Sequence, residues 1–114
     1  GRLSNITMEK GNIITAGNIF TVNIKIGSYN FFNLNCTIGH DTIIGDSNII
    51  NPGCNVSGGV KIGNGNLIGT NATILQYLKI GNNSVVGAAS LVTKEVPNNQ
   101  IHIGVPAKLF KEIT

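Results

Sequence analysis

One histidine in this sequence is followed directly by a carboxylate, and that pair is the strongest candidate for chemistry. His40 precedes Asp41, and Asp41 and Asp46 are the only acidic residues between Lys10 and Lys94. A neighbouring carboxylate orients an imidazole and strengthens it as a base. The same residues also fit a solvated histidine in a polar loop, so both interpretations stay open at this point.

The remaining side chains with chemical potential are two cysteines and a second histidine. Cys36 and Cys54 are 18 residues apart, and two thiols are too few for a structural zinc site, which takes four ligands. We expect them to be buried thiols that act as small apolar side chains, although a disulfide is geometrically conceivable. His102 lies near the C-terminus, and we interpret it as structural.

An unbroken hexapeptide repeat must position these residues. Every sixth residue from Met8 to Val92 is apolar, fifteen in succession, and the following residue is glycine in seven of them. Isoleucine, asparagine and glycine together make up 50 of the 114 residues. A period of six fits neither an amphipathic helix nor a heptad. It indicates short parallel strands joined by tight corners.

Three hexapeptides close a triangular coil, so residues 18 apart stack with a spacing of about 4.8 Å. The predicted fold is all-β: a parallel β-helix of about five coils over residues 1–96. Residues 97–114 are expected to form a capping tail that runs back along the solenoid with a short strand and a final helical turn. The stacking places Gly58 and Gly59 over His40 and Asp41, which predicts a bay free of side chains beside the imidazole.

Composition argues against several classes of protein. The net charge of +3 is small and scattered, and six aromatic residues offer no stacking platform, so we expect no nucleic-acid partner. No apolar run reaches the roughly 18 residues of a membrane helix, and the first residues lack the apolar core of a signal peptide. We therefore expect a cytoplasmic protein that does not associate with membranes.

Three segments together resemble one family. They are NCTIGHDTIIGD at residues 35–46, PGCNVSGGVKIG at residues 52–63 and GVPAK at residues 104–108. This pattern is similar to the sialic-acid O-acetyltransferase and UDP-amino-sugar N-acetyltransferase group of hexapeptide-repeat acyltransferases, over about residues 14–108. The resemblance implies a left-handed β-helix that transfers an acetyl group from acetyl-CoA to a hydroxyl or amine of a sugar or nucleotide-sugar.

The resemblance also implies roles for individual residues. His40 matches the general base of the family, and Asp41 matches the acidic residue that increases its basicity. Acetyl-CoA is the co-substrate, no metal takes part, and the cofactor lies in a groove between two subunits of a homotrimer. Contacts to CoA in the family fall on Gly58, Thr70 and Ala88. A position that carries a histidine in some members is Ile49 in this chain.

Two further groups of residues are expected to contact the cofactor on physical grounds. Backbone N–H groups near Gly58 and Gly59 are candidates to hold the developing oxyanion. Lys94 lies in the column that starts at His40, roughly 15 Å further along the solenoid axis. We expect Lys94 to bind the phosphates of CoA, joined by Lys108 if the tail returns along the same edge.

The sequence also bears on other functions that such a fold could serve. A zinc enzyme of the gamma carbonic anhydrase kind needs three histidines per metal, whereas this chain has two, 62 residues apart. An ice-binding face needs stacked threonines, but the column through Thr15 continues as Asn33, Asn51 and Gly69. A catalytically inactive scaffold or binding module remains the open alternative.

Overall fold

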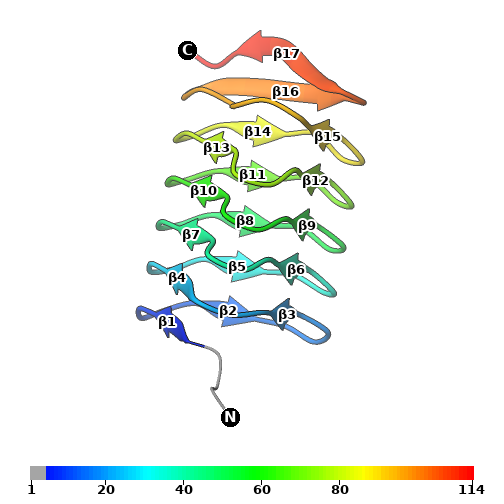
Figure 1. Cartoon of the computed structure of the whole chain (residues 1–114). Coiled ribbons are helices and arrows are strands. Elements are labelled where there is room, and N and C mark those ends of the chain that lie inside the picture. The colour runs from blue at the N-terminus through cyan, green and yellow to red at the C-terminus, as the bar shows by residue number, and fades with distance from the viewer. Residues whose placement is uncertain (1–4) are drawn as a thin grey trace.

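The computed structural model describes residues 5–114, which form a left-handed parallel β-helix, as the resemblance implied (Figure 1). Three sheets form the sides of a triangular rod with extents of 45 × 24 × 23 Å. We call them faces A, B and C in the order in which the chain visits them. The turns between faces form three edges, named by the faces they join.

The strands of each face are short and stack in register. Face A consists of β1 (Ile6–Met8), β4 (Ile24–Ile26), β7 (Ile43–Ile44), β10 (Lys61–Ile62) and β13 (Lys79–Ile80). Face B consists of β2 (Ile13–Ile14), β5 (Phe31–Phe32), β8 (Ile49–Ile50), β11 (Leu67–Ile68), β14 (Val85–Val86), β16 (Gln100–Gly104) and β17 (Ala107–Glu112). Face C consists of β3 (Ile19–Phe20), β6 (Thr37–Ile38), β9 (Asn55–Val56), β12 (Thr73–Ile74) and β15 (Leu91–Val92).

The predicted 18-residue register is the observed one through β15. Ile44 pairs with Ile26 below it and Ile62 above it on face A, and the inward residue of each strand enters the core. Most of these inward side chains are buried, whereas Met8 and Ile14 in the first coil are 37% and 41% exposed. Narrow aliphatic columns therefore form the core, which explains why the sequence uses so few aromatic residues.

Three of the 17 asparagines form a buried ladder inside the solenoid. Asn30, Asn48 and Asn66 stack along the A–B edge, 1% exposed or less. Each amide oxygen accepts a hydrogen bond from the backbone N–H of the next residue in the column, at 2.8 Å. Each amide nitrogen donates to a glycine carbonyl at 2.7–2.8 Å. The ladder satisfies buried polar groups that the tight turns would otherwise leave unpaired.

The C-terminal tail differs from the sequence-based expectation. It contains no helical turn, because β16 continues face B beside β14 and β17 pairs antiparallel with β16. The chain reverses after Gly104, which has a φ of 107° that favours glycine. The tail therefore lies across the end of the solenoid and does not run back along it (Figure 1).

His102 ends the inner column of face B. It pairs in register with Val86, and its Nε2 lies 2.8 Å from the side-chain oxygen of Gln100. Partial burial lowers the pKa of His102 below its ordinary value of 6.5. This environment fits the structural role expected from the sequence.

Candidate active site

A tight turn at the C–A edge presents His40 to solvent. The turn spans residues 39–42, between β6 and β7, and Asp41 adopts a left-handed φ of 61°. Two backbone hydrogen bonds fix it to its neighbours: Asp41 N–H donates to the Val22 carbonyl at 3.1 Å, and the His40 carbonyl accepts from Gly59 N–H at 2.7 Å. The backbone of His40 is thus held on both sides by adjacent coils.

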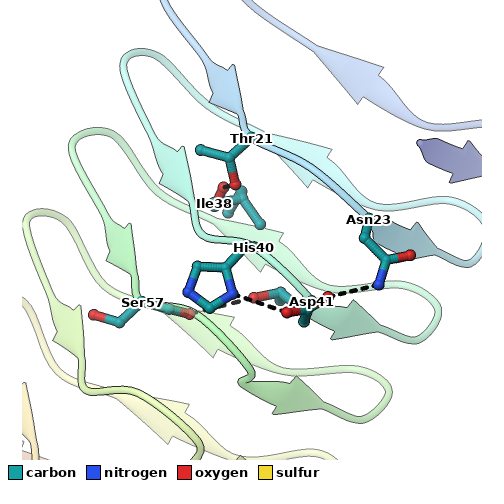
Figure 2. A network of polar contacts seen from close by, with 7 residues as sticks. Thr21, Asn23, Ile38, His40, Asp41 and Ser57 are labelled. Carbon is teal, nitrogen blue, oxygen red and sulfur yellow. Dashed lines mark hydrogen bonds and ion pairs between the residues drawn. The ribbon is translucent and has the colours of Figure 1, made fainter. Parts of the chain in front are cut away.

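The imidazole is oriented by a carboxylate from its own turn. His40 Nδ1 lies 2.9 Å from Asp41 Oδ2, and this is the one ion pair within residues 5–114 (Figure 2). The hydrogen bond from His40, together with one from Asn23, lowers the pKa of Asp41 below its ordinary value of 3.8. A charged Asp41 places the proton of a neutral imidazole on Nδ1, which leaves Nε2 free to accept a proton.

Gly58 and Gly59 accommodate two rings from opposite sides. A Cβ on Gly58 would overlap Nε2 and the adjacent carbons of His40. A Cβ on Gly59 would overlap the ring of Tyr77 from the coil above, and Gly59 also has a φ of 70°. The stacking of Gly58 on His40 is as predicted. The expectation of a patch bare of side chains is wrong, because the imidazole occupies the space over Gly58 and Tyr77 covers Gly59.

Tyr77 was not among the site residues predicted from the sequence. Its side chain is 69% exposed, and its φ is 60°, an uncommon conformation for a bulky residue. It stands 18 residues after Gly59. That spacing was the available signal, and it places an aromatic ring one coil above the glycine pair.

The predicted cofactor contacts divide between two edges. Lys94 is exposed in the last turn of the C–A edge, after β15, where the 18-residue register shortens because Val96 pairs with Ile80. Thr70 and Ala88 are exposed on the B–C edge, where the Thr70 carbonyl accepts a hydrogen bond from Ala89 N–H at 2.8 Å. Face C separates these two edges, so a single chain does not bring the two groups together.

Lys108 lies away from His40. It pairs with Ile103 across β16 and β17, close to the point where β14 leads into the B–C edge. The expectation that the tail carries Lys108 along the edge of His40 is therefore wrong. The reason is the reversal after Gly104, which sends β17 across face B.

The two cysteines are free and buried, as expected. The thiol of Cys36 donates to the Asn51 carbonyl at 3.1 Å, and that of Cys54 donates to the Gly69 carbonyl at 3.0 Å. The hydrogen bond with Cys36 and burial together raise the pKa of Cys54 above its ordinary value. Cys54 therefore packs the core as a neutral donor.

The surroundings of His40 are open. Its side chain is 51% exposed, and surface hollows of about 310 Å³ and 220 Å³ lie over face A, around Lys25 and between Lys61 and Lys79.

Within residues 5–114, no three histidine, cysteine, aspartate or glutamate side chains gather as a metal site would require. No helix in this part of the chain has the length and apolar character to cross a membrane.

Comparison with known proteins supports the resemblance. The family model for the bacterial transferase hexapeptide (six repeats) matches residues 59–94. No curated protein matches the sequence. Among solved structures, the chain is similar to perosamine N-acetyltransferase from Caulobacter crescentus in complex with CoA and GDP-perosamine. That match has a TM-score of 0.90 at 25% identity and covers 94% of this chain and 51% of the other.

Two further structures extend the likeness to a second acetyltransferase and to an O-acyltransferase. A galactoside acetyltransferase in complex with coenzyme A matches with a TM-score of 0.90 and 31% identity, over 95% of this chain and 65% of that protein. The UDP-N-acetylglucosamine O-acyltransferase LpxA of Moraxella catarrhalis matches with a TM-score of 0.94 and 28% identity, over 98% and 46%. The chain thus spans about half to two thirds of the length of these three proteins.

Proposed function

We propose that this chain is an acetyl-CoA-dependent acyltransferase that acetylates a hydroxyl or amine of a sugar. The observation that carries the proposal is the arrangement of His40, Asp41 and Gly58 on a hexapeptide-repeat β-helix. The similar structures that hold CoA are transferases of sugars, which supports the same class of reaction.

The reaction needs a base that takes a proton from the acceptor. Asp41 binds Nδ1 of His40, so Nε2 is the atom that receives the proton from the attacking hydroxyl or amine. The resulting imidazolium is stabilised by the carboxylate beside it. When bound, acetyl-CoA supplies the activated acyl group as a thioester. No covalent attachment to the protein is required.

The backbone hydrogen bonds distinguish Gly58 from Gly59 as the donor to the oxyanion. The Gly59 N–H already donates to the His40 carbonyl at 2.7 Å, which removes it as a free donor. The Gly58 N–H has no hydrogen-bond acceptor within residues 5–114. We therefore assign the oxyanion contact to Gly58, and leave Gly59 the role of shaping the turn beside the cofactor.

The proposed cofactor site is completed by a second copy of the chain. Gly58, Gly59 and Lys94 lie on one edge, whereas Thr70 and Ala88 lie on another, with Lys108 close to them. If all contact CoA, the B–C edge of one copy must face the C–A edge of its neighbour. This arrangement supports the homotrimer expected from the resemblance.

Face B offers the apolar surface that such an assembly needs. Its outward side chains stack in one ladder of Ile13, Phe31, Ile49, Leu67, Val85 and Ile101. Ile13, Ile49 and Leu67 are 59%, 43% and 37% exposed in the single chain. On face A, three of the five outward positions are lysines, Lys25, Lys61 and Lys79, and only Ile43 is apolar. A continuous apolar stripe on one face indicates an interface between copies.

Three further assignments belong to this proposal. The acceptor is an amino sugar, a sialic-acid-like sugar or a nucleotide-sugar, and the reaction takes place in the cytoplasm, where acetyl-CoA is made available. Residues 97–114 cap the last coil of the repeat in residues 1–96. The hairpin of β16 and β17 supports the capping role, since it covers the open end of face B.

The test is release of free CoA from acetyl-CoA in the presence of amino sugars, sialic acids and nucleotide-sugars, each supplied separately. We expect acceptor-dependent release by the purified protein and an acetylated product identified by mass spectrometry. Inorganic buffer without acceptor gives the background rate. No release above background with any acceptor, from a correctly folded sample, would leave the chain as an inactive scaffold.

A further inference from the structure

We propose that Asn23 is a positioning residue that holds Asp41 in the orientation it needs to direct His40. The amide nitrogen of Asn23 lies 2.6 Å from Asp41 Oδ1, while Asp41 Oδ2 contacts His40 Nδ1 at 2.9 Å (Figure 2). The three side chains form one line from the coil below to the imidazole. As a contribution to catalysis, the inference rests on the proposed function.

The carboxylate needs a second anchor because the pair is open to solvent. The side chains of His40 and Asp41 are 51% and 54% exposed. Exposed ion pairs are weak and do not by themselves hold two side chains in one geometry. With Asn23 on Oδ1, both carboxylate oxygens are engaged, so the plane of the carboxylate is fixed and Oδ2 stays at Nδ1.

The chemistry of the two groups sets the direction of the contact. A carboxylate can only accept, so the Asn23 amide must turn its nitrogen toward Asp41. Asn23 and Asp41 are stacked residues at the same turn position, with φ of 54° and 61°. Asparagine tolerates this left-handed backbone. Its amide reaches the carboxylate of Asp41 in the next coil. The hydrogen bond of Asp41 N–H to the Val22 carbonyl keeps the two turns aligned.

The consequence for His40 is a fixed tautomer. A carboxylate held at Nδ1 keeps the proton of the neutral imidazole there and leaves Nε2 unprotonated beside Gly58. Released from Asn23, the carboxylate can rotate into solvent. The imidazole then loses its preference for the Nδ1–H form. The position of this proton can be measured without any assay of activity.

Two variants separate the effect of the Asn23 hydrogen bond from the effect of the turn conformation. Asn23→Ala removes the amide, and Ala89 shows that alanine is accepted at this turn position, with φ of 58°. Asn23→Asp keeps the size and turn preference but cannot donate to Asp41 at neutral pH. Asn83→Ala is the matched control, because Asn83 has φ of 55° at the same turn position on the A–B edge.

The experiment measures the His40 tautomer by long-range ¹H–¹⁵N correlation spectra of the full chain, at a pH where the ring is neutral. His102 serves as an internal reference. We expect the parent and Asn83→Ala to hold the Nδ1–H form, and both Asn23 variants to shift toward Nε2–H. In the acetyl-CoA assay, kcat should fall about 3–10-fold in both Asn23 variants, with the Michaelis constant for acetyl-CoA unchanged.

The outcomes distinguish this inference from the proposed function. Parent-like tautomers in both Asn23 variants would overturn the positioning role, whatever the rates. A fall in kcat that Asn83→Ala shares, with no change of tautomer, would overturn it as well, because the effect would then come from the solenoid as a whole. A shifted tautomer in a protein without transferase activity would support the role of Asn23 and contradict the proposed function.

Discussion

Two aspartates in one coil show how the same residue type serves different ends on different edges. Asp46, on the A–B edge, accepts a hydrogen bond from the backbone N–H of Ser28 at 2.8 Å. Asn64 accepts the equivalent bond one coil later, from Asp46 N–H at 2.7 Å. The carboxylate of Asp41, on the C–A edge, instead contacts the side chains of His40 and Asn23. The column that a residue occupies, more than its type, therefore separates a carboxylate that holds the backbone from one that orients a histidine.

The largest difference between the two edges is expected from truncation of His40, the proposed base. His40→Ala should lower turnover by roughly 10²–10⁴-fold with little change in affinity for acetyl-CoA, since only the proton acceptor is removed. On the A–B edge, Asn64→Ala should leave turnover intact and lower stability by about 1 kcal/mol, because Asp46 N–H loses its acceptor. Steady-state kinetics and thermal unfolding of both variants check this. A fully active His40→Ala protein would break the comparison.

A second test separates the two glycines of the C–A edge. Gly58→Val should displace the imidazole, because the new side chain overlaps the far end of His40, and turnover should fall about 10²-fold while the fold holds. Gly59→Ala should instead cost roughly 1–3 kcal/mol of stability, because its φ of 70° disfavours a side chain and Tyr77 lies against it. Kinetics and thermal melts are compared. Equal losses of stability would show that Gly58 serves the backbone as well.

A third test asks whether His40 and its neighbours on the C–A edge are active only when copies of the chain assemble through face B. Ile49→Lys places a charge in the apolar ladder of face B and should dissociate the assembly, with loss of activity at micromolar protein. Ile43→Lys is the control on face A, where Lys25 and Lys61 already flank that position in register. Sedimentation analysis gives the mass of each variant. A parent-like mass for Ile49→Lys would exclude face B from the interface.

The smallest effect concerns the lysines. Replacing Lys94 and Lys108 together by Gln should flatten the rise of the Michaelis constant for acetyl-CoA with ionic strength, a change of a few-fold across the usual range of salt. Turnover at saturating acetyl-CoA should stay the same. Single replacements show which of the two lysines contributes to this dependence. An unchanged salt dependence in the double variant would remove both lysines from the cofactor site.

The repeating part of the molecule follows from sequence spacing. A period of six with apolar residues at each step fixes which side chains enter the core, and the 18-residue coil places Gly58 against His40. The path of the tail cannot be predicted from the spacing, because the period ends at Val92. The positions of β16 and β17 depend on the reversal after Gly104. Where the period stops, the sequence no longer specifies which edge a residue occupies, which is why Lys108 was misplaced.

The role of Asn23 was hidden for a different reason. The chain contains 17 asparagines, most of which suit the turns and ladders of the solenoid, so the residue type carries no functional signal. Tyr77 is one of few aromatic residues in the chain, but this alone does not indicate which residue it contacts. Its contact with Gly59 is predicted only when the 18-residue step is applied to every position of the C–A edge. Side-chain direction at the turns, which spacing does not fix, decides both cases.

The pH dependence of turnover in Asp41→Asn, set beside Asp46→Asn, tests the central claim most directly. The hydrogen bonds from His40 and Asn23 hold the pKa of Asp41 below 3.8, so its charge persists through the working range and is lost only as the pH falls below that value. Asp41→Asn should move the acidic limb of the pH–rate profile to lower pH, because the imidazolium loses its partner. Asp46→Asn should leave it in place, since asparagine already fills that column at Asn64. An unmoved limb in Asp41→Asn, or an equal shift in both variants, would contradict the account.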